Sequence, residues 1–129
     1  MALHAQGDID GALAEVRKAI ASAPTFAEAH SYLGSTLITR KGRFAEGLEA
    51  LAQAEAASPD DPTLQYTLGW CSEFVSHRVS RRPRPGLDPD ELYQRAEGHL
   101  RRCLELKPDA KIRDDAKDLL ATIIKEDVE

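Results

Sequence analysis

The stretch "AEAHSYLGSTL", residues 27–37, has the sequence of a helix, but its interior carries a glycine at position 34. Glycine inside a helix costs about 1 kcal/mol relative to alanine. A glycine in such a place indicates that a neighbouring element comes too close to leave room for a side chain. We therefore expect a second helix to cross the first at Gly34.

The Leu-Gly pair of this stretch returns 35 residues later, as Leu68 and Gly69. Several other pairs share the same offset: Gly7 and Gly42, Ala12 and Gly47, Ala19 and Ala54, Pro24 and Pro59. A third copy keeps the internal spacing of the first at three positions: Ala96, Cys103 and Pro108. A repeat of this length, in a chain with only 5% aromatic residues, predicts an all-α fold. Each unit is expected to be a helix, a turn and a second helix that ends near a proline.

The repeat divides the chain, which has the length of one domain, into four parts. We expect a partial repeat at residues 1–26, a full repeat at 27–61, a repeat with an insertion at 62–108 and a capping helix at 109–129. In the full repeat, the helices are expected over 27–40 and 44–57, and Asp60 or Asp61 is expected to cap the next helix ahead of Pro62.

The insertion and the two chain ends differ from the regular repeat. Pro59 and Pro108 are 49 residues apart instead of 35, so roughly fourteen residues are added, and we expect them to form a loop rich in proline and arginine at about 76–89. Residues 1–6 are expected to be the last third of a helix. In the capping helix, one face is apolar: Ile112, Ala116, Leu119, Leu120 and Ile123.

The pattern resembles the tetratricopeptide repeat, a helix-turn-helix unit of about 34 residues with Leu-Gly in its first helix, small residues in its second and a closing proline. The matching residues of the full repeat are Leu33, Gly34, Gly42, Phe44, Gly47, Leu51, Ala54 and Pro59. The family's frequent tryptophan, three residues before Leu-Gly, is replaced by His30 and Gln65. The resemblance covers residues 1–108. It implies an α-α superhelix, a solenoid of antiparallel helix pairs, in which Gly34 and Gly69 allow close helix packing.

Signals for catalysis, cofactors and metals are absent from the sequence. It contains no GxGxxG, P-loop, GxSxG or HExxH pattern, and its four histidines and two cysteines lack metal-ligand spacing. Cys71 and Cys103 are expected to be buried thiols. We therefore predict a protein that is not an enzyme and that uses no cofactor and no metal.

Charge and hydropathy limit the compartment and the partners. The net charge of −5 and the isoelectric point near 5.4 argue against a general nucleic-acid binder. No apolar run is long enough to cross a membrane, and "MALHAQGDID" lacks the parts of a signal peptide. The expected location is the cytoplasm, with no membrane partner.

A helical wheel distinguishes two faces on the first helix of the repeat at 62–108 and on the first helix of the repeat at 27–61. In the repeat at 62–108, the packed face of this helix consists of Leu64, Leu68, Cys71 and Val75. The opposite face carries Tyr66, Trp70, Glu73 and Phe74. In the preceding repeat Ala29, Leu33 and Thr36 are expected to face inward, and Ser31, Ser35, Ile38 and Thr39 outward. The resemblance implies that the outward residues line a concave groove for a peptide or a partner helix.

Tyr66 and Trp70 are the expected anchors of that groove, because large aromatic side chains dominate binding energies. The alternative is that both side chains pack under the insertion or against the capping helix. The predicted function is accordingly a non-enzymatic scaffold that binds a protein or peptide. A structural function is the main alternative: the incomplete first repeat stacks on further repeats of a larger chain or on a second copy.

The insertion contains four arginines among few other charges: Arg78, Arg81, Arg82 and Arg84. Such a segment can contact an acidic protein, a phosphorylated segment or nucleic-acid phosphate. The competing interpretation is a solvated loop whose arginines pair with acids on the protein's own surface.

Overall fold

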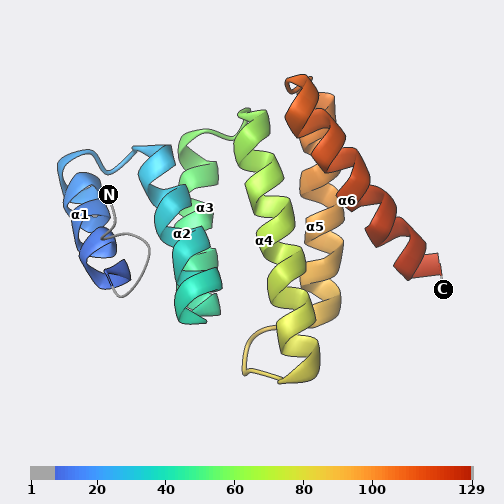
Figure 1. Ribbon diagram of the computed structural model, residues 1–129, viewed down its shortest axis with the longest axis horizontal. Coiled ribbons are helices and arrows are strands. Elements are labelled where there is room, and N and C mark those ends of the chain that lie inside the picture. Colours follow the sequence, from blue (N-terminus) through green and yellow to red (C-terminus); the bar gives the residue numbers. More distant parts are fainter. Residues whose placement is uncertain (1–7, 129) are drawn as a thin grey trace. The chain divides into compact units, whose positions relative to one another are not determined.

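The computed structural model describes residues 8–128, with side chains for residues 8–125. It consists of two compact units, Met1–Ser58 and Pro59–Glu129. The first unit contains α1 (Ile9–Ser22), α2 (Ala27–Lys41) and α3 (Phe44–Ala57). The second contains α4 (Pro62–Arg81), α5 (Pro89–Glu105) and α6 (Ala110–Val128). The six helices, shown in Figure 1, confirm the all-α class, whereas the helix expected at residues 1–6 lies outside the described residues.

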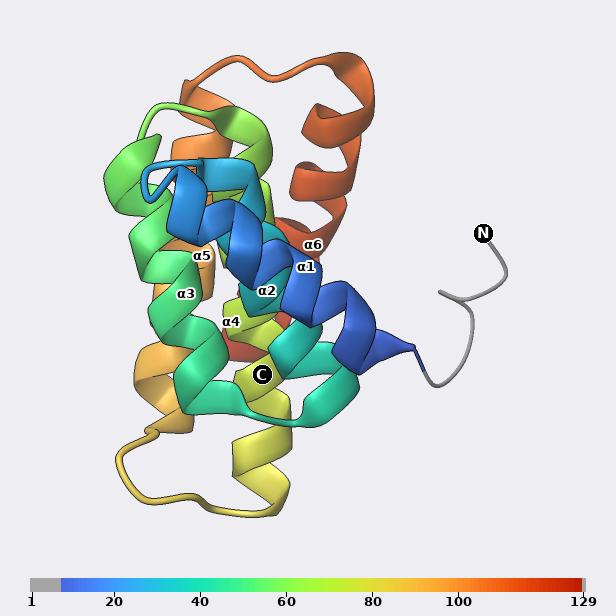
Figure 2. The same ribbon diagram turned by 90° about the vertical axis from the view of Figure 1, so that its left-hand side faces the viewer.

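In the first unit, α2 and α3 are joined by a tight turn that reverses the chain. Gly42 ends α2 in the left-handed conformation, with φ of 66°, which glycine adopts without strain. The amide of Arg43 then donates a hydrogen bond of 2.9 Å to the carbonyl of Leu37, closing the last turn of α2. As a result α3 runs back along α2, and α1 packs on α2 as Figure 2 shows.

Gly34 lies where α2 and α3 cross, as its place in the repeat predicts. A Cβ atom added to Gly34 would come within 2.7 Å of the carbonyl oxygen of Gly47, and one added to Gly47 within 2.8 Å of the carbonyl oxygen of Gly34. Carbon atoms do not approach oxygen so closely without a shift of the backbone. The two glycines therefore permit this helix crossing together.

Ile38 also belongs to this crossing, so its expected outward position is wrong. Its side chain is only 1% exposed, and it would meet a Cβ added to Gly47. Ile38 follows Gly34 by one helical turn and therefore shares its face of α2. That face packs against α3, and the wheel had assigned it to solvent.

In the second unit, α4 and α5 form the longer helix pair. The predicted packed face of α4 is buried: Leu64, Leu68, Cys71 and Val75 are all at most 5% exposed. The stripe continues to Val79, which is 1% exposed. The hydroxyl of Ser76 donates a hydrogen bond of 2.7 Å to the carbonyl of Pro89, which links α4 to the start of α5.

The loop expected at about 76–89 is therefore too long. Residues 76–81 continue α4, and only residues 82–88 connect the two helices. The insertion lengthens the helix pair instead: α4 has 20 residues where α2 has 15, and α5 has 17 where α3 has 14. Val79 continues the apolar spacing of the helix, whereas the first proline of the segment comes only at position 83.

The last helix, α6, packs on α5 and α4 through the face that the sequence predicts. Ala116, Leu120 and Ile123 are buried in a cluster with Leu100 and Cys103 of α5. Ile112 and Leu119 pack against the same cluster from its edge. This core fixes one side of α6 on α5 and turns its charged side outward.

Polar side chains tie the starts of α2 and α4 to the turns that precede them. The ring nitrogen Nε2 of His30 lies 2.7 Å from the carbonyl oxygen of Pro24, and Nε2 of Gln65 donates a hydrogen bond of 3.0 Å to the carbonyl of Pro59. Both residues stand at the repeat position where the family often has tryptophan. Asp61 adds an N-cap to α4, because its carboxylate accepts hydrogen bonds from the amides of Thr63 and Leu64.

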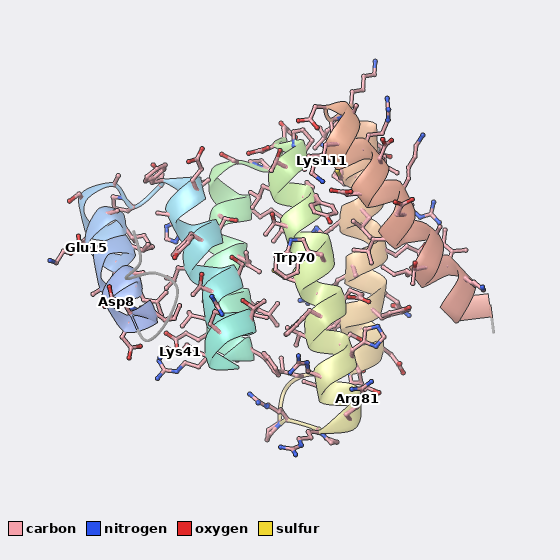
Figure 3. The ribbon with its side chains drawn as sticks, viewed as in Figure 1. Asp8, Glu15, Lys41, Trp70, Arg81 and Lys111 are labelled. Atoms are coloured by element: carbon pink, nitrogen blue, oxygen red, sulfur yellow. The ribbon has the colours of Figure 1, made fainter. Side chains whose placement is uncertain are left out.

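Asp10 of α1 forms an ion pair with Lys41, which lies at the end of α2 (Figure 3). The stabilisation that this pair contributes is expected to depend on pH. Nζ of Lys41 lies 2.5 Å from the carboxylate of Asp10. This contact holds the pKa of Asp10 below its ordinary value of 3.8. Any stabilisation from the pair is therefore complete above pH 3.8 and is lost as the pH falls through the lower pKa of the folded state.

An NMR titration of the Asp10 carboxyl in the intact chain and in Lys41→Met tests this pair. The pKa of Asp10 is expected to rise towards 3.8 in the variant. Lys18→Met is a suitable control, because Lys18 pairs with Glu15 on the surface of α1. An unchanged Asp10 pKa in Lys41→Met would mean that the pair does not form in solution.

Candidate functional site

The second unit contains an open groove of about 520 Å³ between α4 and α6. One wall consists of residues from α4: Tyr66, Trp70, Glu73 and Phe74. The other consists of residues from α6: Asp115, Asp118, Leu119 and Thr122. We call this surface the α4–α6 groove. All four predicted outward residues of α4 line this groove together, whereas no pattern in the sequence selects the four residues of α6.

The aromatic side chains of the groove are positioned by the buried stripe on the other side of α4. Tyr66 packs against the hydrophobic cluster of α5 and α6. The alternative to partner binding, that this side chain packs against the capping helix, therefore holds for part of its surface. Trp70, labelled midway along α4 in Figure 3, is half-buried and lines the groove one turn further on. The groove thus has an aromatic wall anchored at Tyr66.

Carboxylates border this aromatic wall on both helices. Glu73 of α4 lies 2.9 Å from Nε2 of His77, and Asp115 of α6 lies 2.9 Å from Nζ of Lys111. Burial raises the pKa of Tyr66, and the nearby Asp115 carboxylate raises it further. The hydrogen bond to Asp115 in turn raises the pKa of Lys111. Together with Asp118, these groups give the groove an aromatic and acidic lining.

The predicted outward residues of α2 belong to the first unit and form a different kind of surface. Ser35 donates its hydroxyl to the carbonyl of Tyr32 at 3.3 Å, and Thr39 donates to the carbonyl of Ser35 at 2.8 Å. Both hydroxyls are thus bonded to their own helix. Ser31 and Ser35 are half-buried and Thr39 is exposed, while Ile38 is in the core.

The four arginines of the insertion are distributed over a helix end and a loop. Arg78 lies on α4 with its guanidinium 4.5 Å from the centre of the Phe74 ring, a cation–π contact. Arg81 is exposed at the last turn of α4, at the opposite end of the second unit from Lys111 (Figure 3). Arg82 caps this helix, and Arg84 forms an isolated bridge with Leu87. Arg78 therefore already contacts an aromatic residue of the groove.

Both cysteines are buried, as the repeat predicts for Cys103 and the packed face of its helix predicts for Cys71. Cys71 and Cys103 are free thiols with no exposed surface. Burial raises the pKa of Cys71 to about 12 and also raises that of Cys103. Because the thiolate is the reactive form, neither residue has the properties of a nucleophile.

We expect neither thiol to react with a disulfide reagent such as Ellman's reagent in the native protein at neutral pH. Both thiols should react at once after unfolding in guanidinium chloride, since only the fold protects them. The absorbance of the thionitrobenzoate released from the reagent, measured before and after denaturation, checks this. Rapid labelling of one thiol in the native state would show that its helix opens locally.

Among residues 8–125, no three histidine, cysteine or acidic side chains are grouped so that they could hold a metal ion. Within the described helices, none is both long enough and apolar enough to span a bilayer.

Comparison with known proteins identifies one family. Residues 1–62 match the family model described as "Tetratricopeptide repeat", which confirms the resemblance over this part of the chain. No curated protein matches the chain.

Proposed function

We propose that the chain, whose residues 1–62 match the tetratricopeptide repeat, is a scaffold that binds a segment of a partner protein in the α4–α6 groove. Tetratricopeptide repeats generally mediate protein–protein interactions, and the proteins that contain them are typically non-catalytic. In this proposal Trp70 is the main anchor and Tyr66 supports the wall behind it.

The groove itself is the observation that supports this function most directly. It brings together the four α4 residues that the sequence separates from the packed face, and it adds a second wall from α6. Its aromatic side chains are of the type that supplies most of the binding energy in protein interfaces. A volume of about 520 Å³ is sufficient for a few side chains of a partner segment.

Capture of partners from a lysate with a groove variant and a matched control tests the proposal. Trp70→Ala removes the central aromatic residue of the groove. Phe26→Ala removes an aromatic side chain that is 45% exposed and lines neither groove described in the two units. Tyr66→Ala is less suitable, since Tyr66 also packs against the core.

Partners that bind the intact chain and Phe26→Ala but not Trp70→Ala are expected, with thermal melts showing that all three proteins are folded. Partners retained by folded Trp70→Ala would contradict binding in this groove.

A second candidate function is assembly through the first unit. A groove of about 420 Å³ there includes apolar side chains from three helices: Ile20 of α1, Leu33 and Leu37 of α2, and Ala50 of α3. A second copy of the chain or a further repeat would cover this surface. Sedimentation equilibrium would then show a mass that rises with concentration.

The variant Ala21→Arg tests this assembly, because Ala21 is exposed and lines the groove of the first unit. It should abolish the concentration dependence, whereas Ala14→Arg, on the exposed surface of the same helix, should preserve it. A mass that stays monomeric at all concentrations would contradict assembly.

We also propose a cytoplasmic setting. The two cysteines are both unpaired, and the cytosol keeps thiols reduced.

A further inference from the structure

In the α4–α6 groove, the Asp118 carboxylate and the Trp70 ring have no charged partner among residues 8–125. Asp115 pairs with Lys111, and Glu73 lies 2.9 Å from Nε2 of His77, which carries a charge only when protonated. The Asp118 side chain is exposed and makes no ion pair with any side chain of residues 8–125. Within the same residues, no cation lies over the Trp70 ring. Both groups line the same groove from opposite helices.

The neighbouring ring shows which group suits this wall. Phe74 follows Trp70 by one helical turn, and the guanidinium of Arg78 lies 4.5 Å from the centre of its ring. Indole binds cations more strongly than a phenyl ring does. A cation–π contact on the Trp70 ring would therefore have to come from a cation of another molecule.

The charge of the groove favours a cation of this kind. Its lining carries three carboxylates and no basic side chain, and of these carboxylates only Asp115 has a lysine partner, so the groove favours a cationic segment over an acidic one. A guanidinium can stack on an aromatic face and at the same time donate paired hydrogen bonds to a carboxylate. The lysine ammonium is a point charge on a flexible stem and does not combine these two contacts in one plane.

We propose that the partner segment inserts an arginine side chain into the α4–α6 groove, stacked on Trp70 and paired with Asp118. The aliphatic stem of that arginine would lie against Leu119, which forms the apolar part of the α6 wall. This inference rests on the proposed function and adds to it the chemical class of the partner.

Selection from a random-peptide display library tests the inference on the intact chain. The same library is selected on Trp70→Ala, on Asp118→Asn and on Asp114→Asn. Asp114 is a matched control, because it is an exposed carboxylate on α6 that does not line the groove. Peptides that depend on Trp70 are expected to carry an arginine at a shared position on the intact chain and on Asp114→Asn, and to lose that preference on Asp118→Asn.

A selected peptide then allows a direct measurement, since Trp70 is the only tryptophan of the chain. Its fluorescence should change saturably with the peptide. Replacing the arginine of the peptide with citrulline, its neutral analogue, should weaken binding about tenfold or more. Equal binding of the citrulline peptide would overturn the inference.

The outcomes also separate this inference from the function on which it rests. Peptides that require Trp70 but share no arginine would overturn the inference and leave the groove as a binding site. Peptides that bind Trp70→Ala as well as the intact chain would contradict both. A rise in mass with concentration that disappears in Asp118→Asn would identify a second copy as the occupant, and would overturn the assignment to a separate partner.

Discussion

Replacing Leu100 with alanine is expected to lower the free energy of unfolding of the second unit by about 2–5 kcal/mol. Leu100 is fully buried in α5, in the cluster that also contains Ala116, Leu120 and Ile123 of α6. The variant loses both the buried apolar surface and the contacts around the cavity that it leaves. Urea denaturation followed by Trp70 fluorescence measures the change, because Trp70 lies in the same unit.

Combining this change with Gly69→Ala shows how tightly α4 and α5 pack. A Cβ added to Gly69 would lie 2.8 Å from both Cγ and Cδ2 of Leu100, and 3.4 Å from the carbonyl oxygen of Ala96. Gly69→Ala should therefore destabilise the intact chain but stabilise Leu100→Ala, in which the obstructing atoms are gone and alanine favours the helix. The same destabilisation in both backgrounds would mean that the backbone of Ala96, and not Leu100, requires the glycine.

The variant Gly34→Ala is expected to destabilise the first unit by about 1–3 kcal/mol, although alanine is the better helix former. The added Cβ would lie 2.7 Å from the carbonyl oxygen of Gly47 and 2.7 Å from Cγ of Leu51. The leucine side chain can move aside, but the carbonyl belongs to the backbone of α3. Relief therefore requires α2 and α3 to separate.

A glycine in open space provides the control for this change. Gly98 lies inside α5 and is exposed, and no atom lies within 4 Å of a Cβ added there. Gly98→Ala should stabilise the protein by about 0.5–1 kcal/mol through helix propensity alone. Thermal and urea unfolding of the two variants should thus give opposite signs. If Gly34→Ala were also stabilising, α2 and α3 would not cross as closely as the structure shows.

The repeat made the helices of the first unit and the role of Gly34 predictable. The expected helices over 27–40 and 44–57 correspond to α2 (Ala27–Lys41) and α3 (Phe44–Ala57). Recurrent glycine and proline positions are reliable here, because each has a local cause: a helix crossing, a left-handed turn or a helix end. The packed face of α4 followed from the spacing of its apolar residues for the same reason.

Two local predictions were wrong, namely the loop from residue 76 onward and the outward position of Ile38. Each depends on contacts between helices that neither composition nor a helical wheel contains. Residues 76–81 contain two arginines, which indicated a loop, but Val79 continues the buried stripe and keeps the segment helical. Ile38 lies beside the inward face on the wheel. Its burial depends on the absence of a side chain at Gly47, on another helix.

The second wall of the α4–α6 groove could not be predicted from the sequence. Asp115, Asp118, Leu119 and Thr122 become neighbours of Trp70 only when α6 packs on α5 and α4 (Figure 1). The apolar face of α6 was predictable, but its angle across the other two helices is set by side chains in the core of the second unit. Sites that span several helices depend on this angle, so their composition appears only in three dimensions.

The short connection between α4 and α5 has a consequence for protein engineering. Its residues 82–86 and 88 are exposed, and Gly86 adopts φ of 79° with open space around it. The hydrogen bond from Ser76 to Pro89 joins α4 to the start of α5 outside this loop. The entropic cost of a longer loop grows only slowly with its length. A fluorescent domain or an affinity tag can therefore be placed at Pro85–Gly86 without disturbing the helix pair or the α4–α6 groove.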